Sequence, residues 1–252
     1  MGNAAGFVRL LGMRWTTLLE LDDGLDSSIG VDGPRMRVNK DPWSWITHFA
    51  GMIAAAIGTI YLVLNSAGGI EKRSGMVIYG GSLTLCMATS AAYHYFDLGT
   101  VGNRWLRRAD HSAIFLLIGG TFVPACLHLL TGSWRTGMLI GMAIMASTGI
   151  LFKLAWLDAP RWLSTGIYVA MGWSVFIPAP QMWPNMSMAT VTWLVAGGAF
   201  YTFGAIIYGT RRPNPLPNVF GFHEIWHLLV LAGAACHYAF AYSFCDAPCL
   251  PL

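Results

Sequence analysis

Seven long apolar stretches decide what this chain can fold into. Each has close to the length, about 20 residues, that an α-helix needs to cross the hydrocarbon core of a bilayer. They cover residues 43–65, 75–96, 110–131, 136–156, 161–179, 188–208 and 221–243. The fifth is the least regular, because Pro178, Pro180 and Pro184 interrupt a helix at its end. The pattern predicts an all-α integral membrane protein, a bundle of seven transmembrane helices.

Charged residues are too few for a soluble domain of this length. Of the 252 residues, 55% are hydrophobic and 11% are charged, whereas about a quarter of the residues in an ordinary soluble domain are charged. The formal net charge is only +3, and no basic stripe with interleaved aromatic residues occurs. We therefore expect a multi-pass protein of the cell membrane whose partners are lipids, with no nucleic-acid partner.

The distribution of Lys and Arg predicts the orientation of the bundle. With a cytoplasmic N-terminus, all but three of the fifteen Lys and Arg residues lie in the N-terminal segment or in loops on its side; the exceptions are Lys72, Arg73 and Arg135. Cytoplasmic loops carry an excess of these residues, so seven spans should leave the C-terminus extracytoplasmic. There, Cys245 and Cys249 could close a small disulfide loop.

The segment ahead of the first span is harder to interpret. Residues 1–42 are expected to form a cytoplasmic segment that precedes a membrane domain at 43–252. Apolar residues recur at helical spacing over 7–21, which fits an amphipathic helix on the membrane surface or, equally well, a flexible tail. Residues 22–42 are rich in turn-forming residues and are expected to be a linker.

Ionisable residues inside the spans gather at one predicted depth. His94 ends the second span, Asp110 and His111 open the third, and His223 and His227 open the seventh. The second span runs outward to inward, while the other two begin inside, so all five residues should lie near the cytoplasmic surface. Because ionisable residues are costly in a membrane, such a cluster indicates a functional site.

The spacing of two of these histidines is typical of a metal site. His223 and His227 are four residues apart, so they share one helix face and can chelate one metal ion. His94 is the best third ligand because of its depth, and three histidines plus water give the open tetrahedral arrangement of catalytic zinc. Ser90 lies one turn before His94, and Asp110 could hydrogen-bond a metal-bound water or orient a ligand.

The remaining histidines favour a plainer interpretation. Taken singly, a buried membrane histidine is more often a satisfied core residue than a ligand. We therefore expect core roles for His48, His111, His128 and His237, although His48, at the inner end of the first span, could line the same cavity.

The seventh span also contains the sequence of a zincin protease motif. His223-Glu224-Ile225-Trp226-His227 reads as H-E-x-x-H, with Glu224 as the candidate base. The usual downstream carboxylate ligand could come only from Asp246, at the far end of the span, so we expect instead that Glu224 faces a neighbouring helix or pairs with a basic residue.

Four sequence elements together resemble the hemolysin III family, which is related to the progestin and adipoQ receptors and more distantly to the alkaline ceramidases. The elements are Asp41-Pro42-Trp43 through Thr47-His48-Phe49, Ser90-x-x-x-His94, Arg107-Arg108-Ala109-Asp110-His111, and His223-Glu224-Ile225-Trp226-His227. The resemblance spans roughly residues 41–243 and favours a bacterial protein. It implies a seven-helix bundle with a cytoplasmic N-terminus and a zinc ion held by His94, His223 and His227, with Ser90 and Asp110 near the metal.

Three functions are compatible with these features. The first is a zinc-dependent hydrolase of a lipid amide or ester, ceramidase-like by analogy with the relatives, in which Asp110 positions water or acts as general base and Ser90 assists. The second is a non-catalytic lipid sensor or receptor, or a membrane homeostasis protein, stabilised by zinc. The third is a pore-forming hemolysin, although no span carries the polar stripe of a wide channel.

Overall fold

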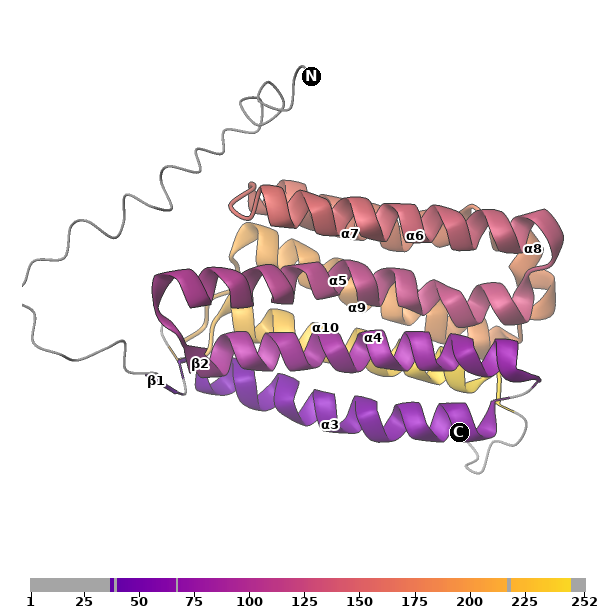
Figure 1. The fold of residues 1–252 in the computed structure, drawn as a ribbon, viewed down its shortest axis with the longest axis horizontal. Coiled ribbons are helices and arrows are strands. Elements are labelled where there is room, and N and C mark those ends of the chain that lie inside the picture. The colour runs from indigo at the N-terminus through magenta and orange to yellow at the C-terminus, as the bar shows by residue number, and fades with distance from the viewer. Residues whose placement is uncertain (1–36, 39, 67, 217–218, 246–252) are drawn as a thin grey trace, which may run out of the picture. The chain divides into compact units, whose positions relative to one another are not determined.

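Long helices that run side by side make up the membrane domain (Figure 1). The computed structural model describes residues 37–38, 40–66, 68–216 and 219–245. In this part of the chain, six helices are long and apolar enough to cross a membrane: α3 (Pro42–Asn65), α4 (Ile70–Tyr95), α5 (Gly99–Leu129), α6 (Gly132–Ala155), α9 (Met188–Thr210) and α10 (Phe222–Tyr242).

The fifth predicted span is broken where the prolines predicted a break. It consists of α7 (Arg161–Trp173), η1 (Ser174–Phe176), α8 (Ala179–Met182) and η2 (Trp183–Asn185). The two arms, Arg161–Phe176 and Ala179–Asn185, are bent by 43°. Pro178 lies at the bend, where its ring excludes the backbone hydrogen bond of a continuous helix. Counting the bent pair as one span gives seven, which confirms the predicted all-α multi-span bundle.

One helix begins well ahead of its apolar stretch. Hydropathy placed the third span from residue 110, but α5 begins at Gly99. The added turns carry Arg104, Arg107 and Arg108. Arg and Leu are good helix formers even where no bilayer favours burial, so hydropathy located the apolar part of this helix and not its start.

Helices close in sequence pack closely through small residues. Contacts join α3, α4, α5 and α6 in chain order; α10 returns to α3, α9 packs against α10, and α7 packs against α9. A Cβ atom on Gly80 would collide with Thr59 of α3, and one on Gly120 would collide with Ser82 of α4. Small residues at such crossings let the backbones of membrane helices approach, as van der Waals packing between them requires.

Several threonine hydroxyl groups inside the spans are satisfied within their own helices. Each donates to the carbonyl oxygen four residues earlier, as seen for Thr59, Thr84, Thr121 and Thr202. In a bilayer no water is available for these groups, so local bonding removes the cost of burying them.

A short antiparallel pairing closes the end of the bundle where α4 finishes. Strand β1 (Arg37–Val38) pairs with β2 (Phe96–Asp97), the residues that directly follow α4. Part of the expected linker at 22–42 is therefore structured. Pairing of these two backbones fixes the approach of the chain to α3, and it brings the residues just before that helix against the last turn of α4.

Some predictions concern residues outside those described. The surface helix or tail expected at 7–21 and the disulfide partner Cys249 are among them. The orientation of the bundle stays the prediction made from the Lys and Arg distribution.

Candidate metal centre

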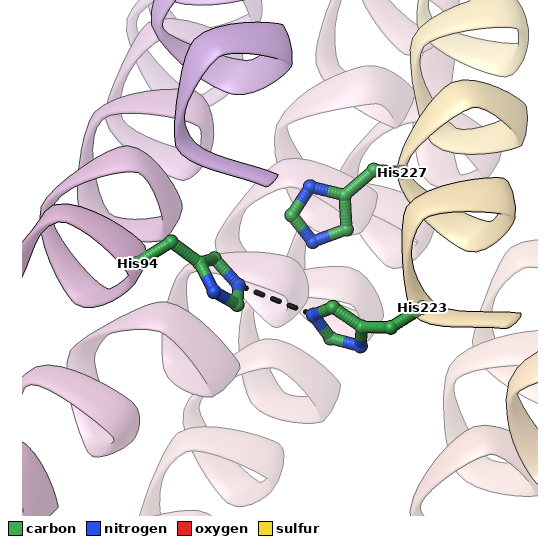
Figure 2. Close-up of side chains that lie close together, drawn as sticks. All are labelled: His94, His223 and His227. Carbon is green, nitrogen blue, oxygen red and sulfur yellow. Dashed lines mark hydrogen bonds between the residues drawn. The ribbon is translucent and has the colours of Figure 1, made fainter. Parts of the chain in front are cut away.

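Three histidines from two helices converge at one end of the bundle (Figure 2). His94 lies in the last turn of α4, while His223 and His227 lie in the first turns of α10. The ring centroids of His94 lie 4.9 Å from those of both other histidines, which are 4.7 Å from each other. One nitrogen from each ring falls within 4.8 Å of the other two. The structure thus brings together the three residues that the sequence proposed as metal ligands.

The near-equal distances between the three histidine rings follow from the positions of these residues on α4 and α10. A four-residue separation puts His223 and His227 one turn apart on the same face of α10. His94 reaches them from the C-terminal end of α4, which carries it to the same depth. His94 and His227 are almost fully buried, with 3% and 2% of their surface exposed.

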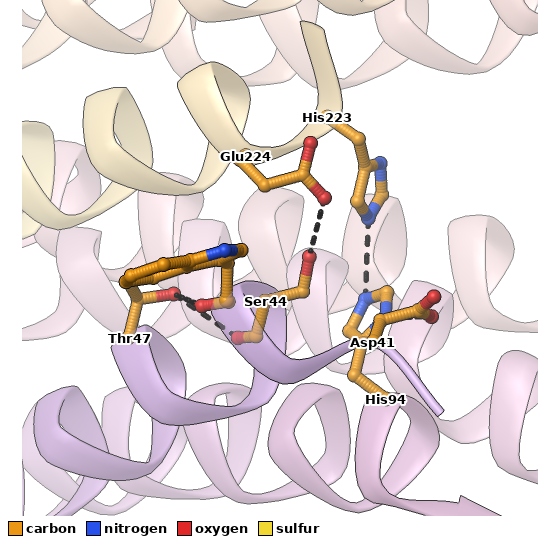
Figure 3. Close-up of polar contacts among 7 residues, drawn as sticks. Asp41, Ser44, Thr47, His94, His223 and Glu224 are labelled. Carbon is orange, nitrogen blue, oxygen red and sulfur yellow. Dashed lines mark hydrogen bonds and ion pairs between the residues drawn. The ribbon is translucent and has the colours of Figure 1, made fainter. Parts of the chain in front are cut away.

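Asp41 fixes the orientation of the His94 ring. Its Oδ2 lies 2.9 Å from His94 Nδ1 (Figure 3), and its backbone N–H donates to the His94 carbonyl at 3.0 Å. The hydrogen bond with His94 holds the pKa of the Asp41 carboxyl below its ordinary value, although burial acts to raise it. A carboxylate facing Nδ1 places the proton there and leaves the Nε2 lone pair directed at the other histidines.

The nitrogen positions fit a zinc ion. His94 Nε2 and His223 Nε2 lie 3.2 Å apart, and the Asp41 contact makes the first of these a lone-pair donor. Adjacent nitrogens on a tetrahedral zinc are about 3.3–3.4 Å apart, since zinc–nitrogen bonds are about 2.0–2.1 Å long. Imidazole is also a preferred ligand of zinc and neighbouring transition metals. The residues therefore suit a transition-metal cation of this kind, zinc among them.

Asp41 was absent from the site proposed from sequence. It forms part of an element quoted for the family resemblance, yet nothing in its own spacing assigned it a role. It lies far in sequence from His94, and only the β1–β2 pairing and the backbone bond bring the two together. One sequence signal points to Asp41. It is a carboxylate that directly precedes a helix, and that helix begins at the predicted depth of the histidines.

Removing the Asp41 charge should weaken metal binding. Asp41→Asn loses the charge that polarises the His94 ring, and carboxylates in this position typically contribute about 10–100-fold to metal affinity. Competition with a calibrated chelator measures the change. Glu71→Gln is the matched control. Glu71 lies in the first turn of α4, at the opposite end of that helix from His94, and pairs with Arg135. Equal zinc affinity in Asp41→Asn and wild type would show that Asp41 does not tune His94.

His48 contacts the candidate metal centre although it is not one of the three candidate ligands. Its ring stacks on that of His227, with centroids 3.7 Å apart and planes at 18°. It is buried, and it lines the cavity described below, as the sequence left open. Its packing restrains the His227 ring from the α3 side.

Glu224 faces a neighbouring helix, one of the two expected alternatives. Its carboxylate accepts from the Ser44 hydroxyl of α3 at 3.1 Å (Figure 3). It also accepts from the Gly221 N–H at 2.7 Å. These bonds cap α10 and tie it to α3. A zincin base would have to face the metal-bound reactants, so this arrangement does not support the protease interpretation.

Asp110 and Ser90 border a cavity that reaches the histidines. The cavity has a volume of about 190 Å³. His223, His227, Ser90 and Asp110 line its polar end. Ser90 comes from α4 and Asp110 from the adjacent helix α5. Two residues proposed from sequence for proton transfer and positioning thus share a wall with two of the candidate ligands.

Two of the other histidines have the partners expected of core residues. His128 Nδ1 lies 2.8 Å from the Pro124 carbonyl oxygen, and the ring stacks on Phe244. His237 Nε2 lies 3.2 Å from the Leu194 carbonyl oxygen. His111 differs, since its ring lines the cavity and its Nδ1 is buried without a hydrogen bond among the described residues.

Comparison with known proteins identifies the family of the chain. Residues 36–238 match the family described as haemolysin-III related. The chain belongs to this family. It is therefore an integral, multi-span protein of the cell membrane, with a histidine group that can bind a metal ion.

The relatives come from bacteria, plants and animals. The chain is 30% identical to the hemolysin-3 homolog of Bacillus subtilis, over 79% of this chain and 92% of that one. It is 32% identical to hemolysin-3 of Bacillus cereus, over 75% of this chain and 84% of the relative. An adiponectin receptor protein of Drosophila melanogaster is 28% identical, over 86% of this chain and 55% of its own length.

Proposed function

We propose that this protein is a zinc-dependent hydrolase of a lipid amide or ester. One observation carries the proposal: the histidine group opens onto a largely apolar cavity whose polar end also holds Asp110 and Ser90. A metal site, a carboxylate and a hydroxyl at the polar end of an apolar cavity form a set of groups suited to metal-assisted hydrolysis.

His94, His223 and His227 would hold the ion, with Asp41 orienting the first of them. When bound, zinc supplies a Lewis acid that brings the pKa of a water molecule toward about 7 and polarises a carbonyl group. In the described part of the chain no fourth His, Cys, Asp or Glu joins the group. Three protein ligands are the pattern of catalytic zinc, whereas structural sites have four.

Asp110 is placed to accept a proton. Its carboxylate borders the cavity, and the Ser90 hydroxyl can donate to one of its oxygens and so fix its rotamer. The other oxygen is left to take a proton from the attacking water and to return it to the leaving amine or alkoxide. General acid–base catalysis of this kind contributes about 10²–10⁴-fold to a rate.

The shape of the cavity favours a substrate with a long acyl chain. Asp110 and Ala125 both line it, and both belong to α5. A helix rises about 1.5 Å per residue, so these positions are roughly 22 Å apart along the axis. Beyond the polar end the lining includes Phe122 and, from the broken span, Met182. A narrow apolar cavity of this length suits one acyl chain with its carbonyl at the histidines.

The alternative of a non-catalytic, zinc-stabilised sensor makes a different prediction about chemistry. Both functions need the metal, but only the hydrolase releases a fatty acid. The purified protein should be incubated with a panel of N-acyl amides, including ceramide, and acyl esters, with released fatty acid measured by mass spectrometry.

Metal removal provides the decisive comparison. Chelator-treated protein should release no fatty acid above background, and zinc should restore the rate. Protein that contains zinc, remains folded and cleaves no lipid of the panel would favour the sensor. Release that persists undiminished after the metal is removed would contradict the proposed mechanism.

A further inference from the structure

A second group of polar residues lines the cavity beside the histidines, and the proposed mechanism does not use it. Lys153 lies in the last turn of α6 with 1% of its surface exposed. Arg161 opens α7, and Ser164 is buried one turn later. All three line the cavity, as does His111 of α5.

In the described part of the chain, no carboxylate forms a direct ion pair with Lys153 or Arg161. The Lys153 ammonium makes a single hydrogen bond, a donation to Ser164 Oγ at 2.6 Å. Neither Lys153 nor Arg161 takes part in any of the ion pairs among the described residues. Arg107, the third cation of the lining, is already paired with Asp158 at 2.8 Å.

Donor atoms in the group lack acceptors. Arg161 has one terminal nitrogen, Nη1, that is buried without a hydrogen-bond partner in the described part of the chain, and His111 Nδ1 is also buried without one. The Arg161 guanidinium instead lies over the Tyr208 ring, 5.1 Å from its centroid. Buried cations and donors without partners are costly, and in membrane spans such groups typically mark a ligand site.

The group lies next to the candidate metal centre. Tyr208 connects the two, since its ring is stacked against Arg161 on one side and lies 5.9 Å from the His223 ring on the other. The cavity is continuous between them and is largely apolar beyond. A lipid whose acyl chain lies in the cavity would therefore have its polar end beside Lys153 and Arg161.

We propose that Lys153 and Arg161 form a binding subsite for the anionic group, carboxylate or phosphate, of a single-chain lipid. The acyl chain lies in the cavity, and Ser164, whose oxygen accepts from Lys153, keeps its hydroxyl proton for the anion. Arg and Lys bind carboxylate and phosphate through short, charge-assisted hydrogen bonds. The inference rests on the proposed function only in placing a lipid in the cavity, since it requires no bond to be cleaved.

Binding to metal-stripped protein tests the subsite separately from catalysis. Three radiolabelled probes share a sixteen-carbon chain: palmitate, 1-palmitoyl lysophosphatidate and the neutral hexadecanol. The variants are Lys153→Met, which keeps the length of the side chain without its charge, Lys153→Arg, which keeps the charge, and Arg161→Gln. Arg104→Gln is the control, because Arg104 is exposed, pairs with Asp158 and lies outside the cavity lining.

Wild type should bind one or both anionic probes more tightly than hexadecanol. Lys153→Met and Arg161→Gln should each weaken that binding about tenfold, with hexadecanol unaffected and Lys153→Arg close to wild type. Whichever anionic probe responds identifies the carboxylate or the phosphate as the source. If Lys153→Met does not fold, Arg161→Gln alone decides.

Three results would overturn the subsite: no preference of wild type for an anion, unchanged anion binding in the folded variants, or an equal loss for hexadecanol. A charge-dependent affinity in a protein that hydrolyses no lipid would retain the subsite and reject the hydrolase. Lipid hydrolysis together with charge-independent binding would retain the hydrolase and reject the subsite.

Discussion

Asp110→Asn should lower lipid hydrolysis by about 10²–10⁴-fold, the contribution typical of a general acid–base group, while zinc content stays at the wild-type level. Asn has the same shape as Asp and can still accept from the Ser90 hydroxyl, so the cavity wall should remain as it is. It cannot take a proton from water at neutral pH. Fatty-acid release and elemental analysis on the same preparation measure the two quantities.

The matched control for this variant is Asp158→Asn. Asp158 is an exposed carboxylate that pairs with Arg104 and Arg107 and does not line the cavity. It removes the same charge without touching the proposed site, so its rate should equal that of wild type. Hydrolysis at the full rate in Asp110→Asn would remove Asp110 from the mechanism even if the metal requirement holds.

The meeting of the three histidines could be predicted because it depends on regular features. Helical periodicity puts His223 and His227 on one face, and counting spans puts His94 at their depth. Neither step requires knowing which helices are neighbours. Hydropathy likewise located the spans, since a bilayer sets the length of its helices, and the prolines located the break in the fifth span.

What the sequence left undetermined depends on lateral packing. The contact between Asp41 and His94 needs the β1–β2 pairing, which rests on two residues in each strand. Glu224 is directed to Ser44 because α10 packs beside α3. In the same way, Lys153 looked like an ordinary loop-proximal cation, and only the approach of α7 to the end of α6 buries it against Ser164. Pattern and depth do not encode such neighbours.

The start of α5 shows a related limit. The turns from Gly99 to Ala109 are helical without being apolar. Hydropathy therefore cannot predict that this segment belongs to the helix. They matter for the site, because Arg107 and Asp110 lie on the resulting continuous helix and both line the cavity.

His227→Ala should abolish stable zinc binding, with a larger loss of affinity than the roughly 10–100-fold expected for Asp41→Asn. The reason is geometric: two remaining imidazoles, from different helices, cannot surround the ion, and His94 is then left with only His223 at 3.2 Å. His227 is also almost fully buried against His48, so truncation leaves a small void that thermal unfolding should register as a modest loss of stability.

His237→Ala separates these two effects. It removes a half-buried histidine from the same helix and the same cavity, but one bonded to the Leu194 carbonyl and remote from the cluster. It should lose stability while keeping its zinc, whereas His227→Ala should lose both. Full zinc content in folded His227→Ala would exclude His227 from the ligands. His94 and His223 would then bind the ion together with a residue outside the group of three. Equal zinc loss in both variants would mean that the metal responds to the integrity of α10 and not to the imidazole itself.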